Sequence, residues 1–380
     1  MRIVYCLNTI SVIGGVEAVS VTKANALAAI PGNKVWMIIC GSSLAPPAFN
    51  ISGKVELLSI DYRITWAFPL NLLQIAKEWG SLRKQLQEHL NRIQPDIVVS
   101  TGGFDKWLVP FTRGRWAFVR EVHGVKSYRR KEKGSFLKKK IATLGEWLDY
   151  HFLVTRVDRI VVLTQEDRIT NWKDNPKIDV IPNPVRFEND LTADVSQNKR
   201  ILAAGRLTYQ KNFSSLIRAF RRIANKYPEW TLVILGEGEE RILLENLIDS
   251  LSLQRQVLLP GNVSNVRDWM FDSSMFALSS RTEGLPLVLI EAMSVGLPVI
   301  SYSCPTGPKD VISNGIDGYL VPPENEEVLA ERIATLIEDP SLRKRMSIAA
   351  IEKSKRFSID QIIRQWCLLF DELCKDNTHI

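Results

Sequence analysis

Two glutamates, Glu283 and Glu291, stand at either end of a segment with the composition of a ligand-binding helix start. The segment begins Gly284-Leu285-Pro286-Leu287 and continues as an apolar run, which predicts a helix with Pro286 in its first turn. N–H groups at the start of a helix, approached through a glycine, bind anions such as a diphosphate. A carboxylate accepts hydrogen bonds from the hydroxyl groups of a sugar. These residue types therefore predict a site for a phosphorylated sugar.

Two cations follow an earlier apolar run, in the segment Gly205-Arg206-Leu207 and at Lys211. Arg206 and Lys211 are five residues apart on a predicted loop that leads into a helix. Both side chains can therefore reach one pair of phosphates, Arg206 as a planar donor fork and Lys211 as a point charge. The alternative is a pair of solvated surface cations.

Two glycine-containing turns and a histidine are further candidates. Gly236-Glu237-Gly238 follows a strand-like run, but Arg241 occupies the place of the third glycine of a dinucleotide-binding fingerprint. Gly14-Gly15-Val16-Glu17 joins the first predicted strand to its helix, where glycines allow a ligand to approach the backbone closely. His123 ends another strand-like run. Ordinary turns and structural histidines occur in the same positions, so none of these features identifies a site alone.

Together, these segments resemble family-4 retaining glycosyltransferases with the GT-B fold, and among them bacterial exopolysaccharide and lipid-linked oligosaccharide glycosyltransferases. Glu283 and Glu291, with seven residues between them, are similar to the E-x7-E signature of that family. They lie within a longer match, S-x-x-E-G-x-P-x-x-x-x-E-A-M-x-x-G-x-P-V-I. The similarity covers almost the whole chain, closely over 200–321 and loosely before it.

The resemblance implies that Arg206 and Lys211 neutralise the diphosphate of a nucleotide-sugar donor without a metal ion, and that Glu291 binds its ribose. It places Glu283 and His123 beside the transferred sugar, so these two and the two cations form the implied catalytic set. The implied donor site comprises Gly14, Gly15, Glu17, Gly205, Arg206, Lys211, Gly236, Glu237, Gly284, Leu285, Pro286, Leu287 and Glu291. The sequence places no obvious second carboxylate as a nucleophile, so attack on the face that the phosphate leaves is expected.

The chain that positions these residues alternates strand-length and helix-length apolar runs, and the alternation occurs twice. Runs rich in Val and Ile are typical of parallel strands buried on both faces. A length of 380 residues also exceeds the roughly 250–300 residues that one core supports. We therefore predict an α/β fold of two Rossmann-like, doubly wound domains facing a cleft (GT-B). The predicted domains are 1–190 for the acceptor, 191–358 for the donor, and 359–380 as a helix packing back toward the first domain.

The predicted elements follow from the same runs. The strands are expected at 2–8, 34–40, 55–60, 97–101, 116–122, 159–164, 201–204, 232–235, 257–259, 275–278 and 298–302. The helices are expected at 16–29, 70–93, 213–225, 241–251, 287–295, 325–338, 341–354 and 359–374.

The net charge of +7 arises mainly in the first half of the chain, and much of it lies in residues 126–140. This stretch contains a single acid, Glu132, and includes the apolar side chains of Tyr128 and Phe136. Such a segment suits an anionic bilayer or a diphosphate, and a solvated loop is the alternative. The candidate contacts to a polyprenyl-diphosphate-linked acceptor or to a membrane surface are Arg129, Arg130, Lys131 and Lys133.

The cysteines and the hydropathy indicate a compartment. Five widely spaced cysteines without a C-x-x-C pair suggest neither a disulfide framework nor a zinc site. The first apolar run is too short for a signal peptide, and no run reaches the roughly 18 apolar residues of a membrane span. We expect a cytoplasmic protein, peripheral on the inner face of the plasma membrane.

The expected activity is retaining transfer of a hexose or N-acetylhexosamine from a nucleotide-sugar to a glycan acceptor in surface polysaccharide biosynthesis. On family frequency the donor is expected to carry UDP, and the acceptor to be lipid-linked. No metal ion, cofactor or nucleic acid is expected. The alternatives are a sugar-nucleotide epimerase or phosphorylase of the same fold, and a non-enzymatic protein that binds anions or nucleic acid. A NAD-dependent oxidoreductase would need the complete G-x-G-x-x-G, which both halves lack.

Overall fold

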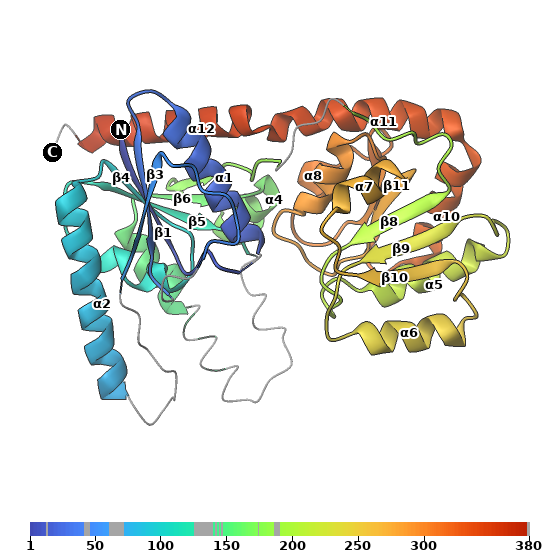
Figure 1. Cartoon of the computed structure of the whole chain (residues 1–380), viewed down its shortest axis with the longest axis horizontal. Coiled ribbons are helices and arrows are strands. Elements are labelled where there is room, and N and C mark those ends of the chain that lie inside the picture. Colours follow the sequence, from blue (N-terminus) through green and yellow to red (C-terminus); the bar gives the residue numbers. More distant parts are fainter. Residues whose placement is uncertain are drawn as a thin grey trace. The chain divides into compact units, whose positions relative to one another are not determined.

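The computed structural model describes residues 1–12, 14–41, 46–60, 72–124, 140, 143, 145, 147–173, 175–185 and 191–377. The chain forms two compact units. Unit 1 comprises Met1–Leu163, Arg168–Pro184 and Ile359–Ile380, and unit 2 comprises Thr164–Asp167 and Val185–Ser358. Each unit contains a parallel β-sheet with helices on both faces (Figure 1).

The described residues of unit 1 form a seven-stranded sheet in the order β3-β2-β1-β4-β5-β6-β7. Its strands are β1 (Arg2–Leu7), β2 (Lys34–Ile39), β3 (Val55–Ser59), β4 (Ile97–Ser100), β5 (Ala117–Val122), β6 (Arg159–Val162) and β7 (Ile178–Val180). Cys6 of β1 lies opposite Ser100 of β4 in the parallel register. The chain therefore leaves β1 and β4 at neighbouring points on one edge of the sheet.

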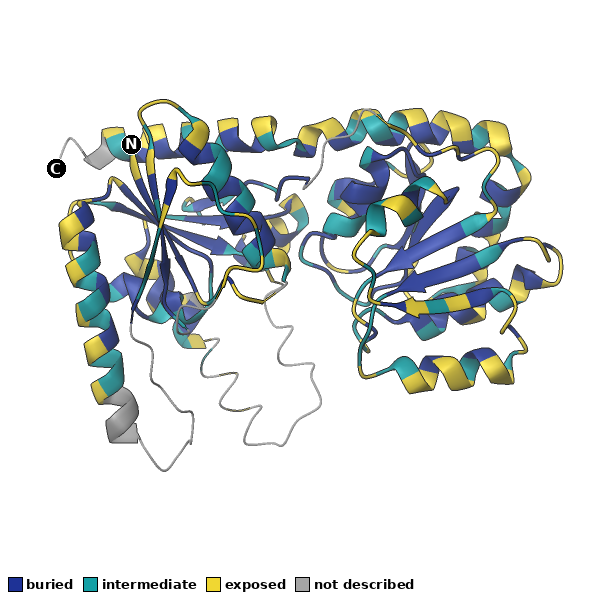
Figure 2. Ribbon diagram, in the orientation of Figure 1, coloured by how far each residue is buried: buried dark blue, intermediate teal, exposed yellow. Residues whose placement is uncertain are grey.

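Helices cover both faces of this sheet. The longer ones are α1 (Gly15–Ala29), α2 (Leu72–Ile93) and α12 (Ile359–Asn377). Shorter helical turns are Phe104–Trp107, Val109–Phe111, Asp149–Leu153, Val154–Arg156 and Arg168–Trp172. Leu27 of α1 and Trp366 of α12 are buried with Val119 of β5. Leu86 of α2 is buried on the other face with Phe118, so neighbouring residues of β5 enter different cores. In Figure 2 the central strands β1, β4, β5 and β6 are accordingly buried almost throughout, whereas the outer strands β3 and β7 are only partly buried.

The described residues of unit 2 form a six-stranded sheet in the order β10-β9-β8-β11-β12-β13. Its strands are β8 (Arg200–Ala204), β9 (Thr231–Leu235), β10 (Val257–Gly261), β11 (Met275–Leu278), β12 (Val299–Tyr302) and β13 (Gly318–Val321). Phe276 of β11 lies opposite Leu202 of β8, so these two central strands also end near one another.

The helices of unit 2 are α4 (Gln165–Asp167), α5 (Phe213–Ala224), α6 (Arg241–Ser250), α7 (Val266–Phe271), α8 (Leu287–Ser294), α9 (Pro308–Val311), α10 (Glu326–Glu338) and α11 (Pro340–Ser354). On one face of the sheet, Phe220 of α5, Leu244 of α6 and Ile333 of α10 share a core. Asn325 and Asp339 cap α10 and α11 with side-chain oxygens that accept backbone N–H groups.

The prediction of two doubly wound α/β parts is confirmed, and each predicted strand and helix has a counterpart. The prediction omitted β7, β13, α4, α7 and α9, which contain only three to six residues each. Elements this short show too little hydrophobic periodicity to be recognised.

Candidate active site

Both sheets reverse their strand order at one point, and sheets of this kind bind ligands at the carboxyl ends of the strands there. In unit 2 the reversal lies between β8 and β11. Residues 205–211 leave β8 at this edge, and residues 279–283 leave β11 beside them. The fold thus brings the Arg206–Lys211 loop and the Glu283 loop together, although the sequence separates Lys211 from Glu283 by 72 positions.

Lys211 and Glu283 form a direct ion pair at this edge. Lys211 Nζ lies 2.6 Å from Glu283 Oε1, and the two side chains are 18% and 8% exposed. Ser280 Oγ donates a hydrogen bond to the same carboxylate oxygen at 2.6 Å. Burial, with a contribution from the charge of Glu283, raises the pKa of Cys304 to about 12, so this nearby thiol is neutral. The Lys211–Glu283 pair is thus held where little solvent reaches it.

Further hydrogen bonds join the two loops. Arg281 N donates to Gln210 O at 2.8 Å, and Gln210 Nε2 donates to Thr282 O at 2.8 Å. Ser279 Oγ donates to the carbonyl oxygen of Lys211 at 3.0 Å. The loops that carry the two charges are thus fixed to one another, as a preorganised electrostatic site requires.

Arg206 and the start of α8 offer hydrogen-bond donors next to this pair in the sequence. Arg206 is exposed, and it forms no hydrogen bond or ion pair with other described residues. The N–H groups of Gly284, Leu285 and Leu287 likewise donate to no acceptor in the described part of the chain. Cations and unpaired backbone N–H groups at a helix start are the groups that bind phosphates.

The prediction that Pro286 lies in the first turn of its helix is wrong by one position. α8 begins at Leu287, and Pro286 precedes it with ψ 85°, which is not helical. Glu291, which was expected about a turn and a half into this helix, is its fifth residue and is 4% exposed.

Gly236 directly follows β9, and its backbone lies against that of Gly205, which directly follows β8. Its φ is +134°, a conformation that only glycine adopts without strain. A Cβ atom on Gly236 would lie 2.0 Å from the carbonyl oxygen of Gly205, so the two turns touch through their backbones. Glu237 next to it pairs with Arg241 of α6 through its carboxylate. Arg241, which interrupts the dinucleotide fingerprint, therefore has a structural partner.

In unit 1 the strand order reverses between β1 and β4. Gly14 precedes α1, Gly15 is its first residue and Glu17 lies in its first turn. A Cβ atom on Gly14 would lie 2.3 Å from Glu17 Oε2, so this carboxylate folds back over Gly14. His123 directly follows β5, and its side chain is 8% exposed. The predicted residues of unit 1 thus lie at one edge of the sheet, without a direct contact between His123 and Glu17 among the described atoms.

Sequence reasoning missed two charged residues next to His123. Lys23 of α1 and Glu121 of β5 form an ion pair in which each side chain is 1% exposed. His123 Nε2 lies 2.9 Å from Glu121 Oε2. The only sequence signal was a lysine four residues from both Val19 and Leu27, where an apolar residue would be expected.

The basic candidates Arg129, Arg130, Lys131 and Lys133 lie outside the described residues. Described residues that follow them in the chain include two exposed aromatic side chains, Trp147 at 54% and Phe152 at 41%. The guanidinium of Arg156 lies 4.7 Å from the ring centre of Phe152 and 4.9 Å from that of Phe111. Among the described helices, none has the length and apolar character of a membrane span.

Comparison with known proteins identifies the family. Residues 13–189 match the model of Glycosyltransferase Family 4, and residues 189–353 match the model of Glycosyl transferases group 1. An uncharacterized glycosyltransferase of Haemophilus influenzae is 31% identical over 371 residues, which cover 96% of this chain and 98% of that protein. The chain belongs to the family-4 glycosyltransferases, as the motifs around Glu283 predicted, and it is a glycosyltransferase.

Two other similar proteins agree with this assignment. A Campylobacter jejuni enzyme is 27% identical over 382 residues, covering 98% of this chain and 99% of that enzyme. Its name is GalNAc-alpha-(1->4)-GalNAc-alpha-(1->3)-diNAcBac-PP-undecaprenol alpha-1,4-N-acetyl-D-galactosaminyltransferase. The structure of sucrose-phosphate synthase from Thermosynechococcus elongatus superposes with a TM-score of 0.79 at 17% identity, covering 98% of each chain. At that identity the likeness concerns the fold, which is GT-B.

Proposed function

We propose that this protein is a retaining, metal-independent glycosyltransferase that moves a hexose or N-acetylhexosamine from a UDP-linked donor to a lipid-linked glycan in surface polysaccharide biosynthesis. The observation that carries the proposal is the Lys211–Glu283 ion pair at the strand-order reversal of unit 2, whose side chains are 18% and 8% exposed, with Arg206 exposed on the same loop. Support for the substrates comes from relatives. The Campylobacter enzyme is named for an undecaprenol-linked acceptor, and one solved structure, Anabaena HepE, holds UDP and glucose.

In the proposed reaction the donor diphosphate lies against Arg206, Lys211 and the N–H groups that precede α8. As the bond between the anomeric carbon and the phosphate breaks, negative charge grows on the diphosphate, and fixed cations stabilise it without a metal ion. The acceptor oxygen bonds to the same face of the anomeric carbon. Its proton passes to the departing phosphate oxygen, so charge and atoms balance.

The carboxylates are assigned separate tasks. Glu291 accepts hydrogen bonds from the ribose of the donor, and Glu283 accepts them from the transferred sugar while it holds Lys211. Gly205, Gly236 and Gly284 are assigned to the donor site as the family resemblance implies; a Cβ atom on Gly205 would lie 3.2 Å from Lys211 Cε, so this turn packs directly against the proposed diphosphate-binding lysine. His123 of unit 1 acts at the transferred sugar, as the family resemblance implies.

Glu291→Gln tests the donor assignment. Adding UDP-sugars in excess of Kd should raise the melting temperature of the wild type, because a ligand of the folded state stabilises it. In Glu291→Gln, donor affinity should fall by about 10-fold or more, since hydrogen bonds to a charged group are worth roughly 1.5–3 kcal/mol. Thermal shift with a panel of UDP- and GDP-sugars measures both effects.

Glu331→Gln, at an exposed position of α10, is the matched control and should keep wild-type affinity. The proposal would be contradicted if no nucleotide-sugar raised the melting temperature of the wild type. Conversion of the donor sugar into its epimer, without transfer, would favour the epimerase alternative.

We further propose that a surface of unit 1 rests on an anionic bilayer together with the basic stretch 126–140. A surface hollow of 370 Å³ is lined by Trp79, Arg83, Pro110, Phe111, Thr112, Arg113 and Arg156. Its three arginines have no carboxylate partner among the described residues. Arginines and aromatic rings on one surface suit the headgroup region of an anionic membrane.

Replacing Arg129, Arg130, Lys131 and Lys133 together with Gln should weaken binding to vesicles of phosphatidylglycerol and phosphatidylcholine. Each basic residue near such a surface contributes about 1 kcal/mol, so a loss of about 100-fold or more is expected. Cosedimentation measures it. The matched control replaces four exposed cations of unit 2, Lys344, Arg345, Lys355 and Arg356, and should bind like the wild type. Equal binding by both variants would overturn this part of the proposal.

A further inference from the structure

The core of unit 1 contains a charged pair that the proposed reaction does not use. Lys23 of α1 donates a hydrogen bond to Glu121 of β5, and each side chain is 1% exposed. Lys23 Nζ also lies 4.7 Å from the ring centre of Trp366 on α12. Burial tends to raise the pKa of Glu121, but the charge of Lys23 and the contact with His123 outweigh it and bring the pKa to about 2. Glu121 is therefore a carboxylate at neutral pH.

This carboxylate lies against His123. Glu121 Oε2 is the atom bonded to Lys23, and it is also 2.9 Å from His123 Nε2. The ring N–H is not well directed at the oxygen, so the contact is mainly electrostatic. His123 Nδ1 has no hydrogen-bond partner among the described residues. A carboxylate beside Nε2 favours a proton on that nitrogen, which leaves the lone pair of a neutral imidazole on Nδ1.

The pair is poorly explained by stability alone. A buried ion pair loses the hydration of both charges, and well-packed apolar residues of similar volume are often equally stable in its place. The surrounding side chains, including Tyr5 and Trp366, already form a continuous apolar core. The distinctive result of keeping the charges is the fixed carboxylate beside the histidine.

We propose that Lys23 and Glu121 are positioning residues for His123: Lys23 fixes the Glu121 carboxylate, which holds His123 with its proton on Nε2 and leaves Nδ1 to act at the transferred sugar. The inference rests on the proposed role of His123 in sugar transfer. It assigns the pair no contact with substrate and adds no chemical step.

The double variant Lys23→Met/Glu121→Gln carries the test. It removes both charges and keeps the core neutral. The double variant therefore remains a usable test even if Glu121→Gln alone fails to fold because Lys23 is left without a partner. We expect kcat for transfer to fall by about 10- to 100-fold, as when a carboxylate that orients a metal-bound histidine is lost. The KM for the donor should stay within about twofold, because the proposed diphosphate and ribose contacts lie in unit 2.

Nitrogen-15 NMR of the histidine side chains provides a readout that does not depend on activity. The chain has four histidines, and His123→Gln identifies the signal of His123. The wild type should show His123 with Nε2 protonated and Nδ1 bare, and the double variant should show mixed tautomers. A fully retained tautomer together with a wild-type rate in the double variant would overturn the inference.

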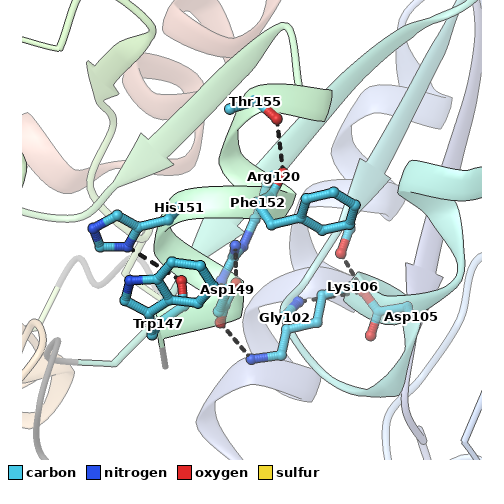
Figure 3. A network of polar contacts seen from close by, with 10 residues as sticks. Gly102, Asp105, Lys106, Arg120, Trp147, Asp149, His151, Phe152 and Thr155 are labelled. Atoms are coloured by element: carbon cyan, nitrogen blue, oxygen red, sulfur yellow. Dashed lines mark hydrogen bonds and ion pairs between the residues drawn. The ribbon is translucent and has the colours of Figure 1, made fainter. Parts of the chain in front are cut away.

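A second buried network supplies the matched control. On the other face of β5, Arg120 forms a two-bond contact with Asp149, and Lys106 Nζ lies 2.7 Å from the same carboxylate (Figure 3). Lys106→Met makes the same chemical change as Lys23→Met, and it should leave both the His123 tautomer and kcat unchanged. If Lys106→Met alters the tautomer as much as the double variant does, the effect is general to the unit and the inference fails.

If the wild type transfers no sugar from any donor, the proposed function fails, while the NMR result still decides the tautomer.

Discussion

Lys211→Ala should lower kcat for sugar transfer by about 100- to 1000-fold, the usual loss when one preorganised group that stabilises transition-state charge is removed. Lys211 lies 2.6 Å from Glu283, on a loop that hydrogen bonds fix to its neighbour. Its ammonium is therefore in place before negative charge develops on the diphosphate. Because that charge is larger in the transition state than in the bound donor, the effect should fall on kcat more than on KM.

Lys211→Ala should also be less stable than the wild type, and this effect distinguishes the structural role of Lys211 from that of Arg206. Without Lys211 the Glu283 carboxylate, 8% exposed, keeps only the hydrogen bond from Ser280 among its contacts with described side chains. Removing one partner of a buried pair costs roughly 3–5 kcal/mol. Arg206→Ala, by contrast, should lower transfer and leave the melting temperature almost unchanged, since Arg206 is exposed.

Transfer kinetics and thermal unfolding of the two variants decide the assignment. Lys226→Ala is the control for loss of an exposed lysine of unit 2, whose side chain is 68% exposed, and it should transfer sugar like the wild type. Lys211→Met/Glu283→Gln should recover much of the stability but not the rate. Near-normal rates of sugar transfer in both Lys211→Ala and Arg206→Ala would rule out the assignment of a metal-free diphosphate site.

The fold was predictable because its signals are local. Apolar runs such as 34–40 and 232–235 are long enough to reveal buried parallel strands, and each begins or ends at a polar boundary. The loop of Arg206 and the loop of Glu283 were assigned to one phosphate site through the family resemblance. The order of the strands then explains why they meet, since β8 and β11 are neighbours at the reversal.

Contacts between distant residues were not predictable in the same way. Nothing in the sequence indicates that Lys211 bonds to Glu283, or that Lys23 finds Glu121 from 98 positions away. Lys23 lies on a helix face that is otherwise apolar, and such a residue is normally expected at the edge of a core. A buried charge can be recognised only when its partner is known, and the partner is supplied by the sheet order.

Gly236→Ala should be the most destabilising of the glycine substitutions near the site. The added Cβ would lie 2.0 Å from the carbonyl oxygen of Gly205, and backbone on both sides leaves no flexible side chain to move. The φ of +134° adds strain of its own. Overpacking and an unfavourable φ each cost about 1–3 kcal/mol, so unit 2 should lose roughly 2–6 kcal/mol of unfolding free energy.

Gly315→Ala separates the two causes. Gly315 also has a positive φ, +81°, but a Cβ there would meet no atom within 4 Å. It should therefore show only the conformational term, about 1–3 kcal/mol, in urea unfolding. Gly236→Ala should in addition weaken donor binding, because the turn that moves away from its Cβ is the one that carries Arg206. If the two variants had equal unfolding free energies, the turns after β8 and β9 would have moved apart to accommodate the new Cβ atom. Turns that move so readily could not hold Arg206 and Lys211 at the fixed separation that a diphosphate site requires.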